Sequence, residues 1–183
     1  MQARLERPGE GEHAPYYDRY IALVPAGDIV SILREQGQAL LEQLRHVPEA
    51  AAGYAYAPGK WCIKEVIGHI ADGERVFGYR ALRFARADHT PLPGFDENQW
   101  MPPAHYGARA LAHVAAEFAA VRAATIALLD GIPEEAWTRQ GEANGQTVSV
   151  RALAVIIVGH ELHHRRILVE RYFPGIGVAL PSA

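Results

Sequence analysis

The sequence predicts an all-α protein, a four-helix bundle with long crossover connections. Four long stretches carry apolar residues at helical spacing, and no stretch of useful length alternates as a β-strand does. Two long irregular segments containing proline and glycine separate the helices. A chain of 183 residues is long enough for one domain with a full core. We expect the bundle over residues 16–175, a flexible arm over residues 1–15 and a tail over residues 176–183.

Start and stop signals set the bounds of the four helices. Asp28 suits an N-cap, Pro48 and Gly131 suit helix ends, and Thr147 or Ser149 could cap the last helix. The predicted helices are residues 28–47, residues 61–87, residues 108–130, and a fourth from Thr147 or Ser149 to residue 172.

The two connections differ in composition from the helices. Residues 88–106 contain four prolines and several aromatic residues, so we expect a segment that packs down as a cover, with one helical turn at 97–101. Residues 133–146 form a second irregular connection, with Trp137 as its anchor. Long connections of this kind in a compact domain are usually functional or disordered.

Histidines on the apolar faces carry the chemistry. His160 and His164 lie four residues apart, so they share the core-facing stripe of the last helix, whereas His163 lies about 90° away. This pair alone fits a hydrogen-bonded core as well as it fits a metal site. His69 on the second helix also faces the core, one turn before Gly73. Room beside an imidazole and close helix packing explain that glycine equally well.

Three imidazoles on facing helices would leave at least one coordination position open on a metal ion, which is typical of a catalytic site. Imidazole suits zinc, nickel, copper and iron alike.

Composition limits the classes of partner. A net charge of −3 and a pI near 6.3 provide no broad basic surface, so we expect neither nucleic acid nor an anionic membrane as a partner. The single cysteine excludes an internal disulfide framework, and the N-terminal residues have no apolar core of a secretory signal. The longest strictly apolar run, residues 152–158, is far shorter than the ~20 residues of a membrane span. We expect a cytoplasmic protein.

Other residues suggest competing chemistry. Cys62 near a helix start could act as a nucleophile, although a lone intracellular cysteine is usually inert. Residues 160–164, HELHH, match the zinc-protease pattern, but the chain lacks a suitable third ligand downstream. Asp72 could hydrogen-bond a ligand imidazole or form a surface salt bridge. Arg80 could bind an anionic substrate group or pair with a carboxylate at the edge of the core.

Three blocks of sequence resemble the DinB/YfiT-like superfamily over residues 16–172: APGKWCIKEVIGHIADGERVFGYR, ARADHTPLPGFDENQW and GHELHHRRILVERY. The resemblance implies a four-helix bundle in which His69, His160 and His164 bind a divalent metal, usually zinc or nickel. It also implies that Asp96, Asn98 and Trp100 line the mouth of a pocket. Cys62 departs from the family, which often has Ser or Thr at this helix cap.

The resemblance further implies an activity. Similar proteins include thiol S-transferases that use bacillithiol or mycothiol and a mycothiol-dependent maleylpyruvate isomerase, in which a metal activates a thiol or a water. The expected function is therefore a metal-dependent thiol S-transferase or hydrolase. A small-molecule substrate and a low-molecular-weight thiol cosubstrate would be its partners, with a homodimer compatible. The alternative is a non-catalytic metal-binding or ligand-binding bundle.

Overall fold

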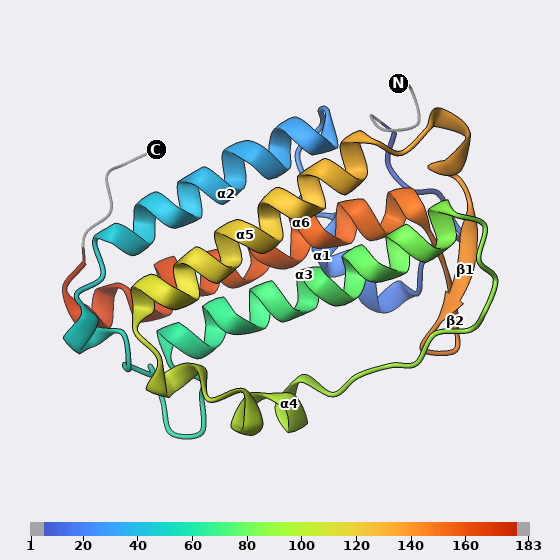
Figure 1. Cartoon of the computed structure of the whole chain (residues 1–183). Coiled ribbons are helices and arrows are strands. Elements are labelled where there is room, and N and C mark those ends of the chain that lie inside the picture. The colour runs from blue at the N-terminus through green and yellow to red at the C-terminus, as the bar shows by residue number, and fades with distance from the viewer. Residues whose placement is uncertain (1–5, 179–183) are drawn as a thin grey trace.

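The computed structural model describes residues 6–178 and confirms the four-helix bundle (Figure 1). Its long helices are α2 (Ile29–Arg45), α3 (Ile63–Ala85), α5 (Leu111–Asp130) and α6 (Val150–Ile167). A π-helical turn, Leu168–Tyr172, extends α6. Two short helices, α1 (Asp18–Ile21) and α4 (Glu97–Ala104), lie outside the bundle. Single 3-10 turns occur at Pro15–Tyr17, Glu49–Ala51, Tyr106–Ala108, Glu134–Ala136 and Pro174–Ile176.

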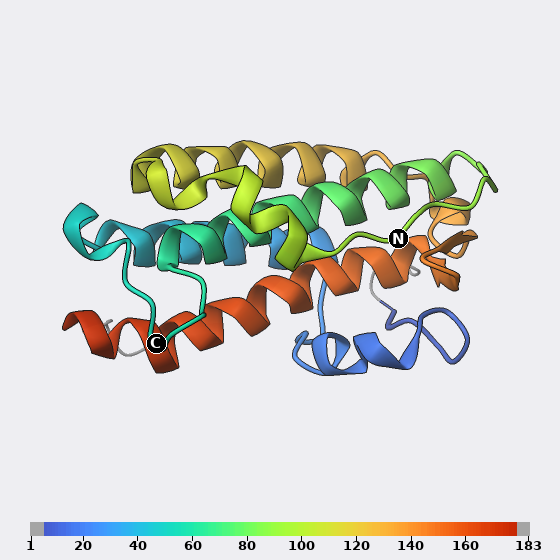
Figure 2. The same cartoon turned by 90° about the horizontal axis from the view of Figure 1, so that it is seen from below.

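The order of the helices includes one crossover. In Figure 1, α2 and α6 run in one direction and α3 and α5 run in the other. Residues 86–110 therefore return along the length of the bundle between α3 and α5, and this segment carries α4 (Figures 1 and 2). The crossover segment lies over one side of α3, where it can cover a site built on that helix.

The structure confirms the N-caps predicted at Asp28 and Ser149. The Asp28 carboxylate accepts a hydrogen bond from the Ser31 backbone N–H at 2.9 Å, and the Ser149 hydroxyl accepts one from the Ala152 N–H at 3.0 Å. Ser149 is thus the cap of α6. At Cys62, the cap residue of α3, the Glu65 carboxylate accepts from the Cys62 N–H at 2.7 Å, so a neighbouring glutamate compensates for the poor thiol cap.

A β-hairpin corrects the prediction of an irregular connection before α6. Strands β1 (Gln140–Ala143) and β2 (Gln146–Ser149) pair antiparallel around Asn144 and Gly145, which have φ of 56° and 70°. Positive φ at both turn positions is the two-residue hairpin geometry that Asn-Gly favours. Leu92 of the crossover segment pairs with β1, since its N–H donates to the Glu142 carbonyl at 2.9 Å. The hairpin therefore anchors one end of the cover. Trp137, just before it, is buried as expected.

Helix α4 is longer than the single predicted turn. The Asp96 carboxylate accepts from the backbone N–H groups of Asn98 and Gln99 at 2.9 and 3.2 Å, which starts the helix. The helix then accommodates both Pro102 and Pro103 before His105 adopts a left-handed conformation at its C-terminus. Proline content alone was therefore a misleading signal for this segment.

The prediction of a flexible arm differs from the structure over residues 6–15. Glu12 is 8% exposed and forms an ion pair with Arg151 of α6. Its carboxylate also accepts from the Ser149 hydroxyl at 2.7 Å, and its carbonyl accepts from the Ser149 N–H at 3.0 Å. The first five residues, and residues 179–183 of the predicted tail, lie outside the described part of the chain.

Glu12→Gln is expected to lower the free energy of unfolding at neutral pH and to reduce its dependence on pH in the acid range. The Arg151 guanidinium holds the pKa of Glu12 at about 2, below its ordinary 4.5, with Gly9 and Ser149 adding hydrogen bonds against the opposing effect of burial. A lowered folded-state pKa stabilises the protein fully above the unfolded-state pKa, and this contribution is lost as the pH falls toward about 2. Since solvent screens this pair at the protein edge, we expect a loss of about 1–2 kcal/mol in the variant at neutral pH.

Urea unfolding at about pH 7 and about pH 3 would measure this difference, which should narrow at the lower pH. Glu10→Gln removes the same charge from an exposed position and should change little. A Glu12→Gln effect that is equal at both pH values would contradict the assignment.

Two apolar clusters fill the bundle, one toward each end. Helix α5 contributes few large side chains, because much of it is alanine. By length and hydropathy alone, α5 is long and apolar enough to cross a membrane. In the fold, a third of the residues in its most apolar stretch are buried, and α5 packs against α2 and α3. A buried ion network lies in this packing interface, where the Arg122 guanidinium contacts Glu74 at 2.8 Å and Glu161 at 2.9 Å.

Candidate metal centre and its cavity

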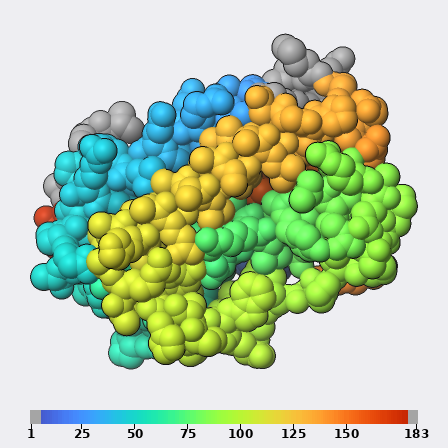
Figure 3. Space-filling model, viewed as in Figure 1, coloured from blue at the N-terminus to red at the C-terminus, as the bar shows by residue number. Residues whose placement is uncertain are grey.

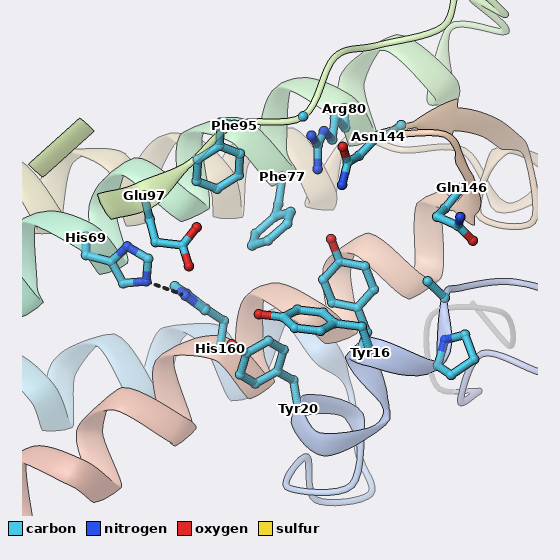
Figure 4. Close-up of a pocket in the computed structure, with 15 residues that line it drawn as sticks. Tyr16, Tyr20, His69, Phe77, Arg80, Phe95, Glu97, Asn144, Gln146 and His160 are labelled. Carbon is cyan, nitrogen blue, oxygen red and sulfur yellow. Dashed lines mark hydrogen bonds between the residues drawn. The ribbon is translucent and has the colours of Figure 1, made fainter. Parts of the chain in front are cut away.

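The three predicted histidines meet between α3 and α6. The Nε2 atom of His69 lies 3.0 Å from Nε2 of His160 (Figure 4) and 3.2 Å from Nε2 of His164. One ligand atom from each residue lies within 4.8 Å of the other two. The facing helices thus bring together side chains that are about 90 residues apart in the sequence.

This geometry fits a metal ion better than a set of hydrogen bonds. Two imidazole nitrogens bound to one ion at ~2.1 Å, with angles of about 90–110°, lie about 3.0–3.4 Å apart. By contrast, the Nε2 atom of His69 has either one proton or one lone pair, so it cannot form two full hydrogen bonds to its neighbours. Three converging lone pairs are satisfied together by a cation. The cluster therefore has the donor set of a metal site, and the two nitrogen pairs that include His69 have the spacing of ligands on one ion.

Burial keeps the three imidazoles neutral. It lowers the pKa of His69 to about 4, and it lowers the pKa values of His160 and His164 well below the ordinary 6.5, with the neighbouring histidines adding to the effect. Neutral imidazole is the form that donates a lone pair to a metal.

Rings and a glycine hold the imidazoles in place. The Trp61 ring packs on His69 at a centroid distance of 4.7 Å, and the Tyr20 ring packs edge-on against His160 at 5.5 Å. A Cβ atom at Gly73 would lie 2.9 Å from Cε1 of His160, which is too close. Of the two explanations for this glycine, room beside an imidazole is therefore the one observed. The imidazole is that of His160 on the facing helix rather than that of His69.

Gly73→Ala is expected to destabilise the protein by about 1 kcal/mol. Alanine favours a helix by up to about 1 kcal/mol, but forcing a methyl group against a packed ring costs about 1–3 kcal/mol. Gly78→Ala is the matched control, since its Cβ would meet only Thr125 Oγ1 at an ordinary 3.9 Å and should stabilise the helix. Urea unfolding would compare the two, and equal effects would show that His160 yields without cost.

A cavity of about 500 Å³ opens beside the histidines. Figure 4 shows His69 and His160 in its wall together with side chains from the crossover segment, α1 and the hairpin. Its wall combines tyrosine and phenylalanine rings with charged, amide and imidazole groups. Lining residues outside the histidine pair include Tyr16, Tyr17, Tyr20, Phe77, Arg80, Phe95, Glu97, Asn144 and Gln146.

The other predicted binding residues divide into two groups. Arg80, one of the predicted substrate-binding residues, lines the cavity. Asp96 and Asn98 do not, because Asp96 caps α4 and both residues are exposed. Trp100 is 44% exposed and instead lines a second, mostly apolar hollow of about 390 Å³ between α3 and the crossover segment. Figure 3 shows the molecular surface hollowed along this segment.

Asp72 does not support a ligand imidazole. One oxygen of its carboxylate accepts from the Tyr106 hydroxyl at 2.9 Å and from Arg75 at 3.1 Å, so the salt-bridge alternative is the one observed. Phe95 and Glu97 were missed. The sequence carries no clear signal for them, because Phe95 lies in an irregular segment and Glu97 is the first residue of the short helix α4.

The competing assignments find no support in the geometry. Glu161, the glutamate of HELHH, is fully buried and contacts Arg122 rather than the cavity, and burial raises its pKa to about 7. It is not placed as the general base of a protease. Burial likewise raises the pKa of Cys62, which is the opposite of what an activated nucleophile requires.

Comparison with protein-family models shows the family of this chain. A family model described as the DinB superfamily matches residues 32–168, which is most of the bundle. The chain belongs to the DinB superfamily. A comparison with curated proteins finds no match.

Solved structures of DinB-like proteins share the fold. YfiT from Bacillus subtilis, described as a probable metal-dependent hydrolase with an unusual four-helix bundle topology, is 16% identical with a TM-score of 0.72, and the match covers 98% of this chain and 100% of YfiT. The DinB-like protein YjoA from Bacillus subtilis is 21% identical with a TM-score of 0.63, over 85% of this chain and 96% of YjoA. A mycothiol-dependent maleylpyruvate isomerase is 17% identical with a TM-score of 0.63, over 79% of this chain and 61% of the isomerase. At these identities the likeness shows the fold.

Proposed function

We propose that this DinB-superfamily protein is a metal-dependent enzyme, a hydrolase acting on a small organic substrate. The observation that carries the proposal is the convergence of three neutral imidazoles, two of which (His69 and His160) lie in the wall of a cavity of about 500 Å³. His69, His160 and His164 would hold a divalent ion, with zinc or nickel as the expected metals. When bound, such an ion supplies Lewis acidity, which polarises a carbonyl and lowers the pKa of a water or thiol ligand.

The chain itself supplies a group that can accept a proton. Glu97, the first residue of α4, points into the cavity on the same side as His69 and His160 (Figure 4). No arginine or lysine is paired with its carboxylate among residues 6–178. We assign Glu97 as the residue whose carboxylate takes the proton of the attacking nucleophile.

Aromatic residues shape the rest of the reaction site. Tyr20 packs on His160, and burial raises the pKa of its hydroxyl, so the phenol stays protonated and can donate a hydrogen bond. The rings of Phe77 and Phe95 exclude water from the cavity wall.

Thiol transfer is the second candidate. It is favoured by the likeness to the mycothiol-dependent isomerase and by the size of the cavity. Cys62 does not line the cavity, so a reacting thiol would have to come from a low-molecular-weight cosubstrate. The two reactions differ in whether turnover requires an added thiol.

A turnover assay on the zinc-loaded and nickel-loaded chain tests the proposal. We expect metal-dependent hydrolysis of an ester or amide in a substrate panel. Glu97→Gln should lower turnover by about 10²–10⁴-fold at unchanged metal content. Glu135→Gln, at an exposed position remote from the cavity wall, is the control. If turnover appears only with an added thiol, the transferase is the correct activity. A loaded protein without turnover on any ester, amide or thiol acceptor would instead be a non-catalytic metal-binding bundle.

A further inference from the structure

A buried arginine forms one part of the cavity wall. Arg80 of α3 is 4% exposed, and its guanidinium carbon lies 5.9 Å from the ring centroids of both Phe77 and Phe95. Its Nη2 donates to the Pro93 carbonyl at 2.8 Å, so the crossover segment fixes the head of the side chain. The guanidinium is therefore held in a defined position between two aromatic rings.

No carboxylate neutralises this charge among residues 6–178. Burial lowers the pKa of Arg80, and the nearby Tyr17 hydroxyl opposes this effect; no acidic side chain in the described part of the chain contributes. The Pro93 carbonyl and the Tyr17 hydroxyl can take two of the five N–H donors, which leaves three for a ligand. A buried cation is costly unless it is paired, so the site favours binding of an anion.

The composition of the wall limits the charge of that anion. Among the described residues that line the cavity, Arg80 is the one arginine or lysine. Glu97 also lines the cavity and opposes a second negative charge. A planar carboxylate with a single charge matches one guanidinium fork better than a phosphate dianion does.

Spacing along α3 sets the length of the ligand. Arg80 follows His69 by eleven residues, so both lie on one face of the helix. The Cα atoms are about 16 Å apart along the axis, and the arginine side chain leans toward the helix N-terminus, which leaves roughly 10 Å between its head and the histidines. Phe77 lies between the two and offers an apolar surface (Figure 4).

We propose that the cavity binds an organic monocarboxylate, whose carboxylate pairs with Arg80 and whose apolar or aromatic body lies against Phe77 and Phe95. This inference rests on the proposed function in taking the cavity as the substrate site. The far end of such a ligand lies at the histidines, so Arg80 selects the substrate while the chemistry occurs at the other end.

Calorimetry with phenylbutyrate and its neutral amide, phenylbutyramide, tests the inference on the full chain. A charge-assisted hydrogen bond contributes about 1.5–3 kcal/mol, so the carboxylate should bind about 10–100-fold tighter than the amide. Arg80→Gln should abolish this preference, and Arg80→Lys, which keeps the charge and loses the planar fork, should retain only part of it. Arg86→Gln removes the same charge from an exposed position at the C-cap of the same helix and should keep the preference.

Metal-free and metal-loaded protein distinguish this inference from the proposed function. His164 does not line the cavity, so His164→Ala should lose the metal and keep the preference for phenylbutyrate. Equal affinity for acid and amide would overturn the inference, as would a preference that survives in Arg80→Gln. A preference seen only with metal bound, and lost in His164→Ala, would place the carboxylate on the metal and would also overturn it.

Discussion

His164→Ala is expected to abolish stoichiometric binding of zinc and nickel. Removing a residue that merely supports a metal ligand costs about 10–100-fold in affinity, so losing one of three direct ligands should cost at least about 100-fold. The measurement is elemental analysis of protein purified without an affinity tag, followed by competition with a chelator. Wild type should carry close to one equivalent, and the variant should carry almost none.

His163→Ala is the matched control, because it removes an imidazole from the adjacent position of α6. His163 packs against Tyr20 and His164 but lies outside the three-histidine cluster. Its metal content should therefore match that of wild type. Equal metal contents in the two variants would contradict the ligand assignment.

The same metal should raise thermal stability. An ion at a concentration of about 100 times its Kd stabilises the folded state by about 2.7 kcal/mol, which corresponds to a Tm increase of about 5–10 °C for a chain of this size. A chelator should reverse the increase in wild type and have no effect on His164→Ala.

Arg122→Met is expected to destabilise the fold by about 3–5 kcal/mol. The guanidinium donates to Glu74 at 2.8–3.1 Å, to Glu161 at 2.9 Å and to the Leu33 carbonyl at 2.8 Å, so it links α5 to α3, α6 and α2. Its removal would leave two buried carboxylates without a cation, and breaking a buried ion pair costs about this amount. Urea unfolding would measure the loss as a lower midpoint.

Arg75→Met provides the comparison, since Arg75 forms ion pairs with Asp72 and Glu117 at the exposed surface of α3. Such pairs contribute only about 0–1 kcal/mol. A second variant, Arg122→Met with Glu74→Leu, should recover part of the loss because it removes one stranded carboxylate. An Arg122→Met effect as small as that of Arg75→Met would show that the network adds nothing to stability.

The three-histidine cluster could be predicted because its information is local. Helical spacing places His160 and His164 on one face, and the apolar neighbours of His69 turn it toward the same core. Once two helices pack face to face, these three side chains have few other places to go. The caps at Asp28 and Ser149 could be predicted for the same reason, since a cap depends on residues within one turn.

The cavity wall could not be predicted in this way. The hairpin had a local signal in Asn144-Gly145, but its strands are too short for alternation to stand out. The prediction that Asp96, Asn98 and Trp100 line the mouth of this cavity was wrong, because a crossover segment has no periodicity that fixes the direction of its side chains. Arg80, predicted from its helix face, does line the cavity, whereas its lack of a carboxylate partner depends on which distant residues surround it.

Helix periodicity and capping act within a few residues, so the four helices, their buried faces and the three histidines on those faces could be predicted without a structure. The folded structure was needed to show that Glu97 and two aromatic rings share a cavity wall with His69 and His160, that Gly73 makes room for His160, and that Glu161 belongs to an ion network. These features depend on contacts between segments far apart in the chain, and such contacts are set by packing that no local pattern records.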